Sequence, residues 1–514
     1  MAGNHKGRGS TIVVQAFLPA PVQTESLHYN WDGGGIAGIV AGCMGEQSNR
    51  STEAAVVPPV VNYAPPPVDI SKPLVGARST LILLICINLF NYIDRQVLAA
   101  VEPDIRRDLL LSNDPNDPNA KAKMGLLSTA FLITYMTLSP VFGILAERFS
   151  RWWIIGIGVA LWSIASGASG LAHSMFGLSA FAILLITRCF VGVGEAAYGP
   201  VAPTLLSDFY PARMRGKILA AFNVALPVGG ALGYAIGGQI ASIDPAHQSW
   251  RWAFYAVVIP GMILSVIAFM RSEPKAGSAD VGGPVTRRAT WGDYLTILKT
   301  SSYILNTTGM TAMTFAIGGI AWWMPDYLQT RGVAPVHGIE ARTIFGGVVV
   351  LGGLFATIGG GIAGDALRKR FSGSYFLVSG VAMLLGVPSF LLMLKVPFPT
   401  AWVFLFFTVF FLFFNAGPTN TILANVTHPA VRATAFALNI LIIHTAGDAI
   451  SPPLIGLIAD KFNDAARPAH GLEVGFGFTT VLMVVGSVLW LFGMRFLAED
   501  TEKAPLRLAP GANA

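Results

Sequence analysis

Twelve separate apolar segments constrain the fold of this chain more than any other feature. Each is at least about eighteen residues long and could cross the ~30 Å hydrocarbon core of a bilayer as a helix. Only 12% of the 514 residues are charged, whereas soluble domains carry roughly 25%, so a soluble core could not enclose this much apolar surface. The segments lie at 79–101, 123–146, 152–172, 177–204, 217–242, 251–270, 302–328, 343–364, 373–395, 400–424, 431–458 and 473–497. The sequence predicts an all-α membrane protein.

The segments fall into two sets of six whose sequences echo each other. Gly361 follows Gly143 by 218 positions (361 minus 143), and Gly417 follows Gly199 by the same spacing. Such a duplication is typical of transporters, in which two halves rock around a site at the membrane midplane. The predicted parts are a disordered tail rich in Gly, Pro, Ser and Ala at 1–77, a six-helix bundle at 78–270, a cytoplasmic linker at 271–300, a second six-helix bundle at 301–500 and a C-terminal tail at 501–514.

The net charge of +6 comes mostly from short breaks between the apolar segments. Lys and Arg are about twice as dense in the loops on one predicted side as in those on the other, as the positive-inside rule requires. The pattern predicts both termini in the cytoplasm, in a plasma membrane or, in a Gram-negative bacterium, an inner membrane. It does not indicate a nucleic-acid-binding face. The expected partners are the lipid bilayer and a small organic or lysolipid-like substrate, with the chain working as a monomer.

Four charged residues lie in the middle of two apolar segments, where an ionisable group is costly unless it faces a cavity or a partner. Asp94 and Arg95 are in the first segment, and Arg188 and Glu195 are in the fourth. Arg188 and Glu195 share a helix face but stand roughly 10 Å apart along it, too far to pair directly. Each therefore needs a partner, and the first segment supplies one of each sign. We predict a charge network of these four residues near the midplane.

Two interpretations of the network remain open at this stage. A carboxylate that takes up a proton would release its arginine to hold an anionic headgroup, which makes the network a transport switch. The alternative is that the pairs only hold two helices together. His444 and Asp448, four residues apart in the eleventh segment, could likewise tune a proton site or form a polar packing patch. Trp322 and Trp323 are interpreted as members of an aromatic belt at the membrane interface.

The loop after the second apolar segment and its copy after the eighth resemble the signature loop of the major facilitator superfamily. The resemblance implies the twelve-helix major facilitator fold and a cytoplasmic gate in which acids and bases latch the halves in the outward-facing state. The residues that carry it are Gly143, Glu147, Arg148 and Arg151 in the first copy, and Gly361, Asp365, Arg368 and Lys369 in the second.

A closer resemblance is to the Spinster-like branch of that superfamily. It is carried by Asn91 to Arg95, by Arg188 to Tyr198, by the junction from Ser207 to Gly216 and by Pro227 to Gly230. Members of the branch are linked to export of lysophospholipids and sphingosine phosphate, and bacterial members to proton coupling. The residues around Pro227 depart from the Gly-Pro motif of drug antiporters.

Together these observations predict a secondary active transporter that is proton-coupled and moves an amphipathic or anionic organic substrate, lysolipid-like molecules included, by alternating access. The alternatives are an organic-anion or sugar-acid symporter of the same fold and, from another class, a membrane sensor that does not transport. An enzyme is not expected, because the chain has no Walker loop, no H-E-x-x-H and no G-x-S-x-G motif. No metal or cofactor is expected, and the proton is the predicted coupling ion.

Overall fold

The computed structural model describes residues 72–504, apart from 112–113, 115–116, 147, 245–247, 275–290 and 429–430. The predicted disordered tail at 1–77 therefore lies almost wholly outside the described residues. So does Glu147 of the predicted cytoplasmic gate. The described chain is helical, and twelve of its helices are long and apolar enough to cross a membrane.

The first six spans fill the region before the linker. They are α1 (Ala77–Ala100), α3 (Ala120–Leu145), α4 (Arg151–Gly170), α5 with α6 (Ala180–Tyr198 and Val201–Phe209), α7 with α8 (Ala212–Asn223 and Ala225–Ile243), and α9 (Trp250–Phe269). Two short turns, α2 (Glu102–Arg106) and η1 (Arg107–Leu111), connect α1 to α3. The sequence analysis did not predict these turns.

The second six spans follow the linker, which ends in a short helix, α10 (Trp291–Leu298). They are α11 (Ser301–Thr330), α12 (Ala341–Arg368), α13 (Ser374–Lys395), α14 with α15 (Ala401–Phe413 and Ala416–Val426), α16 with η4 and α17 (Arg432–Ile443, His444–Asp448 and Ser451–Lys461), and α18 (His470–Gly493). A last short helix, α19 (Leu497–Lys503), follows α18.

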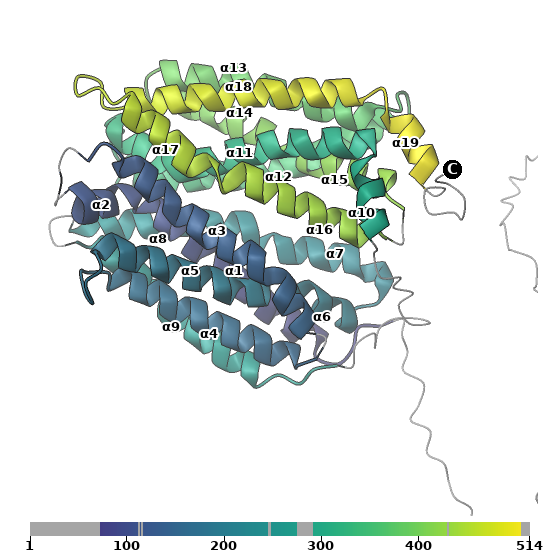
Figure 1. Ribbon diagram of the computed structural model, residues 1–514, viewed down its shortest axis with the longest axis horizontal. Coiled ribbons are helices and arrows are strands. Elements are labelled where there is room, and N and C mark those ends of the chain that lie inside the picture. Colours follow the sequence, from purple (N-terminus) through teal and green to yellow (C-terminus); the bar gives the residue numbers. More distant parts are fainter. Residues whose placement is uncertain are drawn as a thin grey trace, which may run out of the picture. The chain divides into compact units, whose positions relative to one another are not determined.

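Figure 1 shows the purple to teal helices of the first half grouped beside the green to yellow helices of the second. The halves meet along two seams, where α8 packs against α12 and α3 packs against α17. We call the end of the bundle at which α1 stops and α2 follows the far end. The opposite end, where α1 begins and α10 lies, is the linker end.

The Gly-Pro pairs that revealed the duplication mark breaks in corresponding helices. Gly199 and Pro200 separate α5 from α6, and Gly417 and Pro418 lie in the first turn of α15, just after α14 ends. Proline lacks the N–H that a helix interior uses and fits best in a first turn, and here each proline stands at the start of the helix that follows the break. The fourth span of each half is therefore interrupted at the corresponding position.

Glycines in α8 bring it close to α1 at the level of the predicted charge network. A Cβ atom on Gly229 would lie 2.6 Å from the carbonyl oxygen of Leu89, and one on Gly233 would lie 2.6 Å from that of Ile93. Any larger residue would push the helices apart, so these glycines allow close helix–helix packing. The tight contact fixes the part of α1 that carries Asp94 and Arg95.

Candidate functional site

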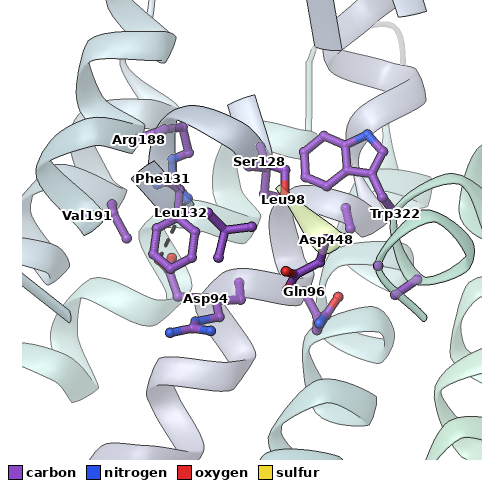
Figure 2. A pocket seen from close by; sticks show the side chains of 14 residues that line it. Asp94, Gln96, Leu98, Ser128, Phe131, Leu132, Arg188, Val191, Trp322 and Asp448 are labelled. Carbon is purple, nitrogen blue, oxygen red and sulfur yellow. Dashed lines mark ion pairs between the residues drawn. The ribbon is translucent and has the colours of Figure 1, made fainter. Parts of the chain in front are cut away.

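A cavity lies between the halves, and its wall carries most of the charged residues singled out in the sequence. The first half contributes side chains from α1, α3 and α5, and the second half contributes side chains from α11 and from η4. Figure 2 shows Asp94, Gln96, Arg188, Trp322 and Asp448 around this space. The charged lining residues are Asp94, Arg95, Arg188 and Asp448, and the apolar ones include Leu98, Ala99, Phe131, Leu132 and Val191.

Arg95 and Glu195 form the stronger of two ion pairs that join α1 to α5. The Nε and Nη2 atoms of Arg95 both lie close to Oε2 of Glu195, at 2.7 and 2.5 Å. Glu195 is fully buried and its Oε1 atom has no hydrogen-bond partner, whereas 23% of the Arg95 side chain is exposed. The guanidinium also lies over the ring of Phe131, 4.7 Å from its centre, an arrangement that stabilises a cation in a dry site.

Asp94 and Arg188 form the weaker pair. Their closest charged atoms, Oδ2 of Asp94 and Nη1 of Arg188, are 3.7 Å apart. The other oxygen of Asp94 accepts a hydrogen bond from Ser166, and Nη2 of Arg188 donates to Ser169 at 2.8 Å. Oδ2 of Asp94 and Nε of Arg188 are buried without hydrogen-bond partners. The structure thus brings the four predicted residues together as two pairs, one tight and one loose.

His444 and Asp448 lie at the two ends of η4, a π-helical turn that interrupts the eleventh span. Nδ1 of His444 lies 2.9 Å from Oδ2 of Asp448. Such turns are rare in helices and often occur at functional sites. Asp448 faces the cavity, and its Cβ packs against α11 at Gly318, where an added Cβ would come within 2.5 Å.

The two tryptophans predicted in an interface belt lie inside the protein, so that prediction was wrong. Trp323 is fully buried and donates its indole N–H to the carbonyl oxygen of Pro452 at 2.9 Å. Trp322 is 6% exposed and lines the cavity. Trp323 bonds α17, which packs against α11, and Trp322 faces the first half across the cavity. The position of a tryptophan near a span end does not reveal such long-range contacts.

The described residues of the predicted cytoplasmic gate lie at the linker end. Arg151 bonds Asp208 of the first half and Glu273 at the start of the linker, each at 2.5 Å. Asp365 accepts a hydrogen bond from Tyr375 at 2.8 Å, and the guanidinium of Arg368 lies over the same ring. A Cβ atom on Gly143 or Gly361 would meet nothing within 4 Å. Arg148 lies in the chain between α3 and α4, and Lys369 directly follows α12.

Charged residues at the far end join the two halves, and the sequence analysis did not single them out. Arg106 on α2 bonds both carboxylate oxygens of Asp326 on α11, at 2.6 and 3.0 Å. Arg342 on α12 donates to Asp104 at 2.9 Å. We call the set formed by Glu102, Asp104, Arg106, Asp326 and Arg342 the far gate.

Backbone and hydroxyl contacts extend this closure towards the middle of the bundle. The backbone N–H groups of Lys121 and Ala122 donate to the carboxylate of Asp460, at 3.2 and 2.9 Å. The Tyr234 hydroxyl donates to the carbonyl oxygen of Ala321 at 2.6 Å. The first two bonds lie on the seam of α3 with α17, and the third joins α8 to α11, so the halves are held together between the cavity and the far end.

Twelve spans in two similar halves, a central cavity with paired charges and a polar closure at one end define a membrane transporter. The model of the Major Facilitator Superfamily matches residues 84–452. The chain therefore belongs to this superfamily and, as its relatives show, to the Spinster-like group within it.

The relatives cover most of the chain. It is 34% identical to Protein spinster homolog 1 of Xenopus laevis over 84% of this chain and 83% of that protein. It is 31% identical to the Sphingosine-1-phosphate transporter SPNS2 of Danio rerio over 81% of this chain and 84% of that protein. A crystal structure of a bacterial homolog of the human lysosomal transporter Spinster shares the fold, with a TM-score of 0.72 and 21% identity over 82% of this chain and 98% of that one.

Proposed function

We propose that this transporter is proton-coupled and moves an amphipathic organic anion by alternating access, with Asp94 and Arg188 as the switch. The loose pairing of these two residues on the cavity wall is the observation that carries the proposal. Their closest charged atoms are 3.7 Å apart, and each keeps one buried polar atom without a hydrogen bond. A buried group in that state gains from a new partner, because an unsatisfied polar atom is costly away from water.

In the proposed cycle a proton from the cavity binds Oδ2 of Asp94 and removes the charge that holds Arg188. The freed guanidinium then binds the anionic group of the substrate with its vacant donors. Loss of the proton restores the aspartate charge, which recaptures Arg188 and releases the anion. Arg95 supplies a second cation at the cavity wall, and Glu195 holds it in the same way through the tighter pair.

The lining of the cavity supports an amphipathic substrate. Cationic side chains lie beside an apolar wall formed by Leu98, Phe131, Leu132 and Val191. An anionic headgroup can bind the cationic side chains, and a hydrocarbon tail can pack against the apolar wall. One of the relatives is named as a transporter of sphingosine-1-phosphate, which supports a lysolipid-like substrate for this chain.

Two other functions make different predictions. An organic-anion or sugar-acid symporter would use the same arginines but would move anions without a tail. A membrane sensor would bind its ligand without moving it. A comparison of a short-chain organic anion with a lysophospholipid, both added to proteoliposomes, separates all three. Uptake of the lysolipid supports the proposal, uptake of the short anion alone favours the symporter, and binding without uptake favours the sensor.

The far gate holds the halves together, whereas at the linker end Arg151 bonds the start of the linker and Asp365 bonds Tyr375 of its own half. We therefore interpret the conformation as inward-facing, with the linker end in the cytoplasm. The basic residues of the short linker-end loops agree with that orientation. A C-terminal epitope tag that antibodies reach only after the cells are permeabilised would support it, and one reached in intact cells would contradict it.

The proton step is tested by neutralising each carboxylate. In proteoliposomes with an imposed pH gradient, we expect Asp94→Asn and Glu195→Gln to lose gradient-driven lysolipid uptake by at least about tenfold, because a neutral side chain no longer exchanges a proton for its arginine. Asp464→Asn and Glu499→Gln are matched controls, because both carboxylates lie in exposed pairs outside the spans. Full proton-driven uptake in both cavity variants would contradict the proposed mechanism.

A further inference from the structure

Glu102 is a buried carboxyl group in the far gate that the mechanism above does not use. It begins α2, directly after α1, and is 0% exposed. Neither of its carboxylate oxygens has a hydrogen-bond partner. The nearest paired cation is Arg106, whose Nη1 atom lies 3.6 Å from Oε1 of Glu102. An ionised carboxylate left in this state would carry a large desolvation penalty.

Arg106 cannot fully neutralise a charge on Glu102, because its guanidinium already makes two hydrogen bonds to Asp326. These bonds measure 2.6 and 3.0 Å and cross from the first half to the second. One cation therefore faces two carboxyl groups. Asp326 holds the bidentate bonds that favour a charged carboxylate, so Glu102 is the group that stays neutral while the gate is closed.

Other charged groups near Glu102 are Asp104 on α2 itself and Lys121 on α3. These two have partners of their own, because Asp104 accepts a hydrogen bond from Arg342 on α12 and the backbone N–H of Lys121 donates to Asp460 on α17. Burial raises the pKa of Glu102 to about 8, with Asp326 and Asp104 adding to the rise while Arg106 and Lys121 oppose it. In water the same side chain has a pKa of about 4.3.

We infer that Glu102 is a positioning residue of the transport cycle, which couples opening of the far gate to release of a proton. Opening separates Arg106 from Asp326 and admits water to Glu102. Once Glu102 has lost its proton, Arg106 is free to pair with its carboxylate. The proton passes from the Glu102 carboxyl to water at the far end. The inference rests on the alternating access proposed above, but on neither the substrate nor the roles of Asp94 and Glu195.

The sign of the effect follows from the two pKa values of Glu102. Because the closed gate holds the proton more tightly, protons stabilise the closed gate. That stabilisation is fully present below about pH 4.3 and is lost as the pH rises through about 8. Between these values the ratio of open to closed gates should rise by up to about tenfold per pH unit.

Spin labels across the far end can measure this ratio without any transport. Ser174 and Ala334 are exposed in far-end loops of the two halves and can be changed to Cys after Cys43, Cys86 and Cys189 are replaced by Ser. Without substrate or gradient, we expect the long-distance population of the parent protein to grow between about pH 6 and pH 9. Glu102→Gln should stay closed with a flat profile, because the amide resembles the protonated acid. Glu102→Asp should keep a pH dependence.

Glu473→Gln is the matched control, because Glu473 lies at the same end but bonds Arg331 within its own half, at 3.2 Å. We expect it to keep the parent profile. If Glu102→Gln does not fold, Glu102→Leu must give a flat profile in its place. A parent protein without pH dependence, or a Glu102 variant that keeps it unchanged, would overturn the inference. Proton-driven uptake that survives in Asp94→Asn would contradict only the proposed function, because the spin-label experiment involves no transport.

Discussion

The Arg95–Glu195 pair illustrates how a single charge depends on its partner in a membrane interior. Glu195 is fully buried, and both close contacts from Arg95 reach only its Oε2 atom. Desolvation of two charges offsets most of their attraction, so such a pair adds little stability as a whole. Removing one partner is different, because the remaining charge stays buried alone.

We therefore expect Arg95→Met to lower the free energy of unfolding by about 3–5 kcal/mol. The double variant Arg95→Met with Glu195→Met should recover most of that loss, because no charge is left unpaired. Thermal unfolding of the purified protein in detergent measures both. Lys503→Met, which breaks an exposed pair with Glu499, is the control and should leave the melting temperature unchanged. A double variant as unstable as Arg95→Met would contradict this account.

At the scale of the elements, glycines decide how closely the halves approach each other at the far end. Gly456 on α17 faces α3, and an added Cβ would lie 2.6 Å from the carbonyl oxygen of Lys121. Both atoms that would clash belong to stiff helices, so one helix must move. The clash exists only while the far end is closed, because α3 and α17 belong to opposite halves.

Gly456→Ala should therefore favour the open far end without harming either half. An overpacked contact costs about 1–3 kcal/mol, so we expect the open-to-closed ratio to rise roughly tenfold, measured with the spin labels at Ser174 and Ala334. Gly477→Ala is the matched control, because a Cβ at that position meets nothing within 4 Å. Equal ratios in the two variants would show that this contact does not limit opening.

The sequence predicted the elements better than it predicted their contacts. Apolar length and the duplicated motifs gave the twelve spans, their division into halves and the superfamily, because those signals are local. The four charges of α1 and α5 could be singled out because charge is rare at mid-span. Glu102, Asp326 and Arg342 could not, because charged residues are ordinary near span ends and only the packing of the halves buries these three. The π-helical turn at His444 is also invisible in the pattern, since it differs from an α-helix only in how its backbone bonds close.

At the scale of the whole molecule, the conformation combines a polar closure at the far end with a central cavity. The two seams that hold the far end consist of helices from different halves, while the ion pairs of the cavity lie within the first half. Rocking can thus open the far gate without breaking the Arg95–Glu195 pair. Two-halved transporters alternate access by such rigid-body motion around a fixed site.

A disulfide across the seam of α8 with α12 tests this motion. A Cβ on Gly238 of α8 would lie 3.0 Å from Cβ of Arg342 on α12, so a small shift of either helix brings the two positions to the Cβ separation of a disulfide, about 3.5–4.5 Å. With the three native cysteines replaced by Ser, we expect Gly238→Cys with Arg342→Cys to cross-link under oxidation and to lose uptake by at least about tenfold, because the far end can no longer open. Reductant should restore uptake. Each single variant is a control, and its uptake should be the same with and without the oxidant. Undiminished uptake by fully cross-linked protein would show that the substrate crosses without separation of α8 from α12.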